Sequence, residues 1–350
     1  MNFRVGIFSA LVLSFHLNIA TFLTASLAEA APVSLMERVD LELKNPMSSL
    51  RESTLEEIKG HHHVLVPGMM NEVANFLGLY YNEVKGFLDS IGAGYTYLGL
   101  PTKTSTLVNT EFLNLKLREI YESQEIKSPI LLRGHSKGGV EVLLTVLKYP
   151  DLILDGIVDR VLLEQAAIRG SILALPSTFS FLNPFSYFYI EEGLKSVHTL
   201  DAQRNLDEAF ETLEVALKDR FRKQAGDFPA TFTPDKVYLN EEKEYVDLMM
   251  AIISSKIRYV RTYQDPNQLS LGTRIVLWAC NQTLDKQSLN DGLVHLDHQK
   301  DERIGDDLGI LKYDHVDLNI SRLSNTTEAE RLAIVRAVLG QLYDESNGEL

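Results

Sequence analysis

The residues best suited to covalent chemistry lie between Gly134 and Gly139, where the chain reads Gly-His-Ser-Lys-Gly-Gly. Ser136 is the centre of a G-x-S-x-G pattern that follows the apolar run 129–133 and opens a helical pattern. Such a strand-to-helix turn is tight, so we expect strained backbone angles at Ser136 and no room for side chains at Gly134 and Gly138. The turn would present the serine hydroxyl beside the N-terminal amides of the next helix. The pattern predicts a nucleophile; the alternative is a glycine-rich turn with an incidental serine.

A serine hydroxyl is a weak nucleophile at neutral pH and needs a base, which in turn needs an acid that orients it. In chains with this turn the order is serine, then acid, then histidine. Asp291 lies beside a glycine in the Asn-Asp-Gly-Leu-Val segment 290–294, and His315 follows it. We therefore predict Asp291 as the acid and His315 as the base. Glu164, which ends the apolar run 158–163, is the alternative acid.

The remaining histidines fit the role of base less well. His135 lies inside the turn, where we expect it to pack or to cap. His295 and His298 share the loop of Asp291, and we interpret them as exposed loop residues. The others precede the serine or the acid in the chain: His16, His61, His62, His63 and His198.

Acyl transfer also needs two preorganised N–H donors for the oxyanion that forms on the carbonyl oxygen. One is expected from Lys137, the residue after the serine. The other is expected from the loop after the run 63–66, where Pro67-Gly68-Met69 stands. Gly68 would let the backbone approach the substrate, and the Met69 amide would donate. The alternative for Pro67-Gly68 is an ordinary turn.

Segments typical of strands and helices alternate along the chain and would position these residues. The apolar runs that predict strands are 63–66, 95–98, 129–133, 158–163 and 274–278. The segments with apolar residues at helical spacing are 71–91, 108–124 and 137–149. Strands that alternate with helices form parallel βαβ units, so we expect an α/β fold with a mostly parallel sheet and helices on both faces.

Two regions depart from this alternation. Between about 171 and 268 the apolar spacing is helical throughout, which predicts a helical cap inserted into the sheet domain. Residues 31–60 form a polar lead-in, and the sheet domain would extend from 61 to 350. Near its end, Asn325 to Glu328 reads as a capping box that opens a last helix through Leu342.

Composition excludes several classes of function. The 350 residues include 34 Lys and Arg against 48 Asp and Glu, so the net charge is −14. An acidic surface repels phosphate backbones, so we expect no nucleic-acid partner. The single cysteine, Cys280, excludes an intrachain disulfide, and neither a Cys-rich zinc site nor an iron–sulfur cluster can be built.

The first 30 residues are typical of a signal peptide. Arg4 precedes an uncharged stretch from Val5 to Ala28, and Ala28-Glu29-Ala30 is a small-x-small pattern that suits signal peptidase. We predict cleavage after Ala30 and export to the periplasm or the medium. The alternative is an uncleaved segment that anchors the protein in a membrane.

Together, several segments resemble the bacterial triacylglycerol lipase branch of the α/β-hydrolase superfamily. They are Val66-Pro67-Gly68, Gly134 to Gly139, Arg169-Gly170-Ser171, Asn290 to Val294 and Asp314 to Asp317. The resemblance covers about residues 60–345 and implies the α/β-hydrolase fold, with Ser136 as nucleophile, Asp291 as acid and His315 as base. It also implies a mobile helical lid at about 171–268 and secretion.

The chain departs from that family's usual pattern at two places. It has Pro67-Gly68 where the family has His-Gly, and Ala166-Ala167-Ile168 where the family has Thr-Pro-His. Family members that bind calcium carry an aspartate just past the catalytic histidine, which Asp317 matches. For their second aspartate, upstream of the acid, Asp265 is the nearest candidate. Calcium is the one cofactor that the resemblance raises, and we otherwise expect none.

The predicted activity is hydrolysis of a carboxylic ester with a hydrophobic acyl part, by a lipase or esterase. Residues 179–190 are rich in aromatic side chains, among them Phe181, Phe185 and Phe188. These would line an acyl pocket or face lipid aggregates; alternatively they pack the lid onto the core. Alternatives with the same three residues are a thioesterase, an amidase or an acyltransferase. A non-catalytic binding protein on this fold is a further alternative.

Overall fold

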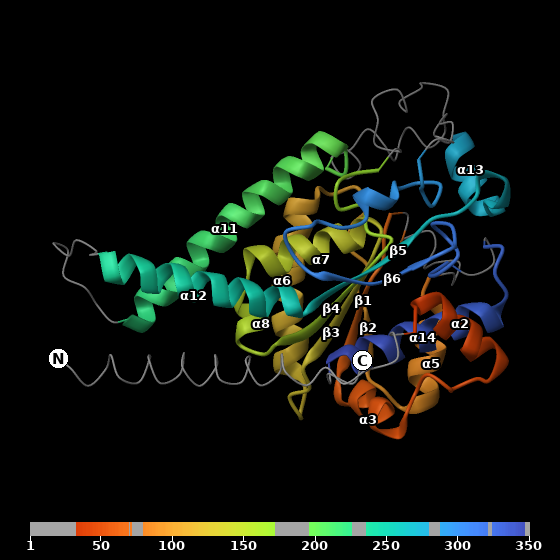
Figure 1. Ribbon diagram of the computed structural model, residues 1–350, viewed down its shortest axis with the longest axis horizontal. Helices are drawn as coiled ribbons and strands as arrows, with labels where there is room; N and C mark the ends of the chain where they lie inside the picture. Colours follow the sequence, from red (N-terminus) through yellow and green to blue (C-terminus); the bar gives the residue numbers. More distant parts are fainter. Residues whose placement is uncertain are drawn as a thin grey trace.

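The computed structural model describes residues 33–69, 71, 80–171, 196–225, 236–279, 288–320 and 324–346. A sheet of parallel strands forms its centre, in the order β2-β1-β3-β4-β5-β6 (Figure 1). The strands are β1 (His62–Val66), β2 (Tyr95–Tyr97), β3 (Ile130–His135), β4 (Val158–Glu164), β5 (Ile257–Thr262) and β6 (Asp306–Leu311). This confirms the predicted α/β class with a parallel sheet.

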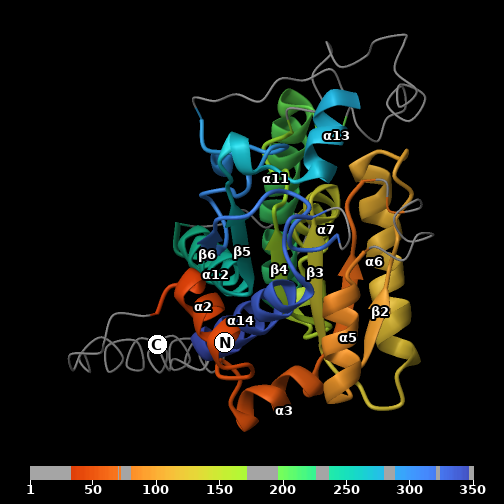
Figure 2. The same ribbon diagram turned by 90° about the vertical axis from the view of Figure 1, so that its right-hand side faces the viewer.

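Helices cover both faces of the sheet. Successive strand residues such as Val64 and Leu65 point to opposite faces, and both are buried. The helices on the face of Val64 are α6 (Thr106–Ser123), α7 (Lys137–Lys148), α8 (Asp151–Leu154), α11 (Thr199–Ala225) and α12 (Lys236–Ser255). Those on the face of Leu65 are α2 (Leu35–Lys44), α3 (Glu52–Gly60), α5 (Asn82–Ile91) and α14 (Glu328–Ser346). Figure 1 shows α2, α5 and α14 on one side of the sheet and α7 and α11 on the other, and Figure 2 looks onto the side of α2, α5 and α14.

The polar lead-in expected at 31–60 is folded from residue 33 onward and packs against the core. Helix α2 begins with a capping box, in which the Ser34 hydroxyl accepts from the Glu37 N–H and the Glu37 carboxylate accepts from the Ser34 N–H. Val39 of α2 and Ile58 of α3 are fully buried in the core that α14 completes. Two short amphipathic helices with few apolar residues therefore help to cover one face of the sheet.

The single helix expected at 71–91 is interrupted. Tyr80 forms an isolated bridge with Ile320, and Tyr81 has a φ of 56°, in the left-handed region where a helix cannot continue. Helix α5 starts only at Asn82. The apolar spacing carries over this turn, so the period alone does not reveal the break.

The strand expected at 274–278 is wrong, because these residues belong to helix α13 (Leu271–Ala279). The sheet strand in this part of the chain is β5, which lies inside the stretch expected to be a helical cap up to about 268. Two arginines interrupt the apolar residues of β5, so a search for apolar runs does not find this strand. Arg261 is satisfied by a bidentate ion pair with Asp307 on β6, at 2.6 and 2.7 Å.

The described helices of the insertion, α11 and α12, rest on the sheet domain. Leu206, Leu213 and Leu217 of α11 are buried in the same core as α7, in agreement with the helical apolar spacing predicted for this part of the chain. Helix α12 crosses α11 and returns to the start of β5 (Figure 1). None of the helices in the described ranges is both long enough and apolar enough to cross a membrane.

Helix α14 begins two residues later than the predicted capping box requires. The box is formed by Thr327 and Glu330, not by Asn325 and Glu328. The Glu330 N–H donates to Thr327 Oγ1 at 3.2 Å, and the Thr327 N–H donates to the Glu330 carboxylate at 2.6 Å. Thr327 to Glu330 matches the same sequence pattern, and a threonine caps by its own hydroxyl.

Candidate active site

Ser136 occupies the turn between β3 and α7 and has φ 55° and ψ −125°. The predicted strain is confirmed, since a residue other than glycine rarely adopts a positive φ. A Cβ at Gly134 would lie 2.8 Å from Gly139 Cα, and one at Gly138 would lie 2.3 Å from the carbonyl oxygen of Pro67. Both positions therefore admit only glycine, as the tight turn predicts.

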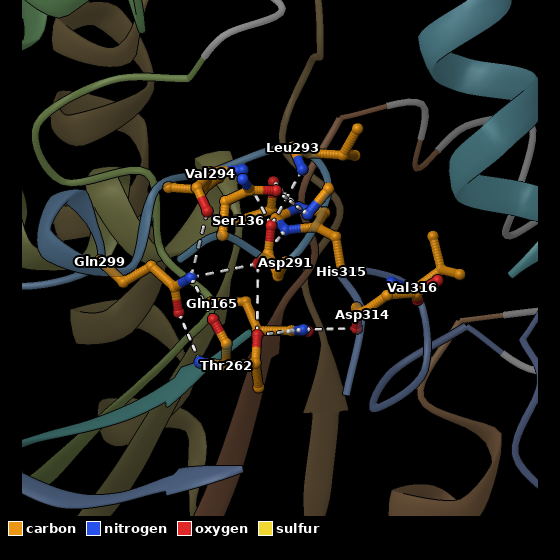
Figure 3. A network of polar contacts seen from close by, with 12 residues as sticks. Ser136, Gln165, Thr262, Asp291, Leu293, Val294, Gln299, Asp314, His315 and Val316 are labelled. Carbon is orange, nitrogen blue, oxygen red and sulfur yellow. Dashed lines mark hydrogen bonds and ion pairs between the residues drawn. The ribbon is translucent and has the colours of Figure 1, made fainter. Parts of the chain in front are cut away.

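The three side chains predicted to act together meet at the carboxyl edge of the sheet (Figure 3). His315 Nε2 lies 2.8 Å from Ser136 Oγ, and His315 Nδ1 lies 2.8 Å from Asp291 Oδ2. Asp291 is fully buried and His315 is 4% exposed, whereas Ser136 is partly exposed. The hydrogen bonds thus run from a buried carboxylate to an accessible hydroxyl.

Asp291 sits in a tight turn that presents its carboxylate. Gly292 has a φ of 98°, and a Cβ there would lie 2.4 Å from a methyl carbon of Thr273. Asp291 Oδ1 accepts the backbone N–H groups of Leu293 at 3.0 Å and Val294 at 2.8 Å. The Asn-Asp-Gly-Leu-Val segment therefore folds around its own aspartate and leaves Oδ2 to face His315.

Two residues that the sequence analysis did not identify complete the surroundings of Asp291. The Thr262 hydroxyl donates to Oδ2 at 3.2 Å, and the Gln299 amide donates to the same oxygen at 3.3 Å. Gln299 also accepts the Thr262 N–H at 2.7 Å and donates to the Thr262 carbonyl at 2.8 Å. Thr262 is the last residue of β5. A correct prediction of that strand from the sequence could therefore have indicated that Thr262 lies near Asp291.

Glu164, the alternative acid, is engaged elsewhere. Its carboxylate forms a bidentate ion pair with Arg133, at 2.5 and 2.6 Å, with both side chains almost fully buried. Its further contact is with the Asn319 amide at 3.3 Å. The structure therefore places Asp291, and not Glu164, on the histidine.

The structure also shows the burial and the contacts of the other histidines near the site. His135 is buried, as expected, and its ring contacts the Tyr80 hydroxyl at 2.5 Å. Burial, together with the nearby His315, holds the pKa of His135 well below its usual value. His295 and His298 are half-buried rather than exposed, and their rings meet edge-on at 5.3 Å.

The two predicted oxyanion donors flank Ser136. Lys137 is the first residue of α7, and Met69 follows Gly68, whose Cβ position would lie 2.6 Å from Ser136 Cβ. In the described part of the chain, neither the Met69 nor the Lys137 backbone N–H donates to a protein group. The Lys137 side chain is turned away and pairs with Glu141 inside the protein. Both amides are therefore free to receive a developing charge.

The two aspartates matched to a calcium site lie in different surroundings. Asp317 is buried and accepts the backbone N–H groups of Asp314 and Asn325, at 3.0 and 2.9 Å. Burial and the adjacent Asp314 raise the pKa of Asp317 to about 7. Asp265 is exposed and caps the short 3₁₀ helix η3 (Pro266–Gln268). Within the described ranges, no group of three or more His, Cys, Asp or Glu side chains could hold a metal ion.

Some predictions lie outside the described residues. Phe181, Phe185 and Phe188 belong to this group, as does the leader 1–30.

Two solved structures of other proteins are similar to this chain to different degrees. A metagenomic carboxyl esterase superposes with a TM-score of 0.56 at 18% identity, over 93% of this chain and 99% of that one. A Bacillus licheniformis lipase in its mature form gives a TM-score of 0.46 at 17% identity, over 73% of this chain and 84% of that one. No protein-family model and no curated protein matches the chain. The likeness to the esterase over nearly the full length confirms the predicted α/β-hydrolase fold.

Proposed function

We propose that this chain is a serine hydrolase that cleaves carboxylic esters with a hydrophobic acyl group. The observation that carries the proposal is the hydrogen-bonded series Ser136, His315 and Asp291, with contacts of 2.8 Å on each side of the histidine. It begins on a serine held in a strained turn at the N-terminus of α7. Strain of this kind persists only where the surrounding structure enforces it, and it is frequent at active sites.

Acylation follows from the geometry. Ser136 Oγ attacks the ester carbonyl carbon while His315 Nε2 takes the hydroxyl proton. Asp291 holds the opposite nitrogen as the donor and stabilises the imidazolium that forms. The negative charge that develops on the carbonyl oxygen is received by the Met69 and Lys137 amides. Collapse of this intermediate breaks the bond to the alcohol, which leaves with the proton from His315.

Deacylation uses the same groups in reverse. Water enters beside His315, which removes a proton from it as the oxygen attacks the acyl carbon. The second tetrahedral intermediate uses the same two amides, and its collapse returns the proton to Ser136 Oγ. The carboxylic acid leaves, and the enzyme regains its starting state.

The choice of an ester is supported by the fold, since the similar structure is that of a carboxyl esterase. A thioester, an amide or acyl transfer to an alcohol would use the same three residues, and substrate tests separate these. A non-catalytic binding protein is disfavoured because all three residues are present and in contact. We further propose that the protein is exported and that it acts on lipid or other hydrophobic ester substrates, in accord with its leader sequence.

The test combines a serine-directed reagent with a substrate panel. A fluorophosphonate should add to one site per chain, and mass spectrometry should locate the adduct on Ser136. p-Nitrophenyl esters and emulsified triglycerides should be hydrolysed faster than matched thioesters and anilides. Labelling without turnover of any ester would remove the ester assignment, and absence of labelling would remove the serine mechanism.

A further inference from the structure

The backbone at Gly68 lies directly against the nucleophile turn. A Cβ there would lie 2.6 Å from Ser136 Cβ and 3.1 Å from the His135 carbonyl oxygen. The Gly68 N–H donates to the Tyr80 hydroxyl at 2.8 Å. Because the Met69 N–H belongs to the next peptide, its position depends on how Tyr80 holds Gly68.

Tyr80 is itself fixed by buried contacts. It is 1% exposed and forms a bridge with Ile320, which lies shortly after His315 in the chain. Its ring packs edge-on against the ring of His135, with centroids 5.6 Å apart. One tyrosine therefore joins the segment of the catalytic histidine to the loop of Gly68.

The direction of each hydrogen bond is determined by the groups present. His135 Nε2 faces two acceptors, Gln165 Oε1 at 3.0 Å and the His315 carbonyl at 3.2 Å, so it carries the imidazole proton. Nδ1 of the neutral ring then accepts the proton of the Tyr80 hydroxyl, 2.5 Å away, while the Tyr80 oxygen accepts from the Gly68 N–H. Burial lowers the pKa of His135, which agrees with a neutral ring that accepts on one side and donates on the other.

Gln165 continues the series in the same direction. Its amide nitrogen donates to the Thr262 hydroxyl at 2.8 Å and to the Asp314 carbonyl at 2.7 Å. Turning the amide over would place its oxygen against the Asp314 carbonyl oxygen, so this orientation is the one that satisfies both neighbours. The Thr262 hydroxyl then donates to Asp291 Oδ2 at 3.2 Å (Figure 3).

We propose that Tyr80 is a positioning residue for the reaction, acting through one series of hydrogen bonds that runs from the Gly68 N–H to the Asp291 carboxylate. The proposal rests on the proposed function. The members of the series, in order, are Tyr80, His135, Gln165 and Thr262, each of which is at most 1% exposed. The series links the residue that precedes an oxyanion donor, Gly68, with the acid that orients the base.

Loss of the Tyr80 hydroxyl removes two bonds at once. The Gly68 N–H loses its acceptor and His135 Nδ1 loses its donor, in a site that water does not reach. Buried polar groups without partners are costly, so the loop must shift until the amide finds another acceptor. A shift of about 1 Å at a reacting group costs on the order of 10²-fold in rate.

The experiment compares Tyr80→Phe with Tyr81→Phe. Tyr81 is an equally buried neighbour whose hydroxyl donates to the Val66 carbonyl at 3.2 Å and contacts neither Gly68 nor His135. Each variant is measured for kcat and KM on a soluble p-nitrophenyl ester, for the rate of fluorophosphonate addition to Ser136, and for melting temperature. We expect Tyr80→Phe to lower kcat and the labelling rate about 10- to 100-fold with KM within about twofold, and Tyr81→Phe to change neither rate.

Equal losses in the two tyrosine variants, or no loss in either, would overturn the proposal. If no ester is turned over but the wild type is labelled and Tyr80→Phe slows labelling, the ester assignment fails and Tyr80 keeps its role. If the wild type is not labelled, both fail.

A second pair of variants keeps the test decisive if Tyr80→Phe does not fold. Thr262→Val removes the last hydroxyl of the series, and Thr262→Ser retains it. Thr262→Val should lower kcat several-fold and Thr262→Ser should restore it. Equal rates in the valine and serine variants would contradict the series.

Discussion

Asp291 and Glu164 are both buried carboxylates near the nucleophile, but they have different partners. Substitution of one or the other should therefore have different effects on the protein. In the proposed mechanism Asp291 orients His315, whereas Glu164 neutralises Arg133. An asparagine at 291 can keep its oxygen on the Leu293 and Val294 amides, which turns its NH₂ group towards His315. His315 Nδ1 must then accept, so the imidazole proton moves to Nε2, where it faces Ser136 and blocks proton removal.

The two variants should change different properties, the turnover rate for Asp291→Asn and the stability of the fold for Glu164→Gln. Asp291→Asn should lower kcat about 10⁴-fold, as the same change does in serine proteases, which corresponds to about 5.5 kcal/mol in the barrier. Glu164→Gln should leave kcat per folded molecule nearly unchanged. It should instead destabilise the fold by about 3 kcal/mol, because the Arg133 cation stays buried without its counter-charge.

The assay measures kcat on a soluble ester, normalised to the folded fraction from circular dichroism, and the free energy of unfolding in urea for both variants. The wild type is the common reference. If Glu164→Gln abolished turnover while Asp291→Asn left it within tenfold of wild type, the acid would be the residue at the end of β4 and the assignment of Asp291 would be wrong.

Further predictions follow from the same structure and sequence. If Phe185 lines an acyl pocket, Phe185→Ala should flatten the preference for C8 and C16 over C2 esters; a uniform loss with a lowered melting temperature would favour core packing instead. Asp317, with its pKa raised to about 7, is protonated in the fold at pH values where the unfolded chain is ionised. The stability of the wild type relative to Asp317→Asn should therefore fall as the pH rises from about 4 to about 7. Burial of His63, whose pKa is lowered to about 4, acts in the opposite direction, so urea unfolding of the two proteins must be compared at each pH. N-terminal sequencing of exported protein should begin at Ala31, and a mature chain that retains Met1 would exclude cleavage.

The nucleophile turn could be predicted because its requirements are local. Ser136 needs glycines at fixed offsets, and Asp291 is held by the amides that directly follow it. Chain order then leaves His315 as the base. These signals do not depend on which strands lie side by side.

The surroundings of that site could not be predicted in the same way. Thr262 reaches Asp291 because β5 lies between β4 and β6. The sequence does not reveal this strand, because two arginines interrupt its apolar residues. The apolar residues of α13 predict a strand instead of a helix. Tyr80 reaches His135 because the chain turns at Tyr81, where an unbroken apolar period predicts helix. Contacts of this kind depend on register and on turns, which the spacing of apolar residues does not contain.

The most direct test of Ser136 as the nucleophile is the turnover of a soluble ester by the Ser136→Ala variant. Ser136 is partly exposed and its side chain contacts the His315 ring, so removal of the hydroxyl should leave the melting temperature within a few degrees of wild type. We predict a loss of several orders of magnitude in kcat, with a small residual activity from the oxyanion donors. A Ser136→Ala protein that hydrolyses the ester at the wild-type rate would contradict it.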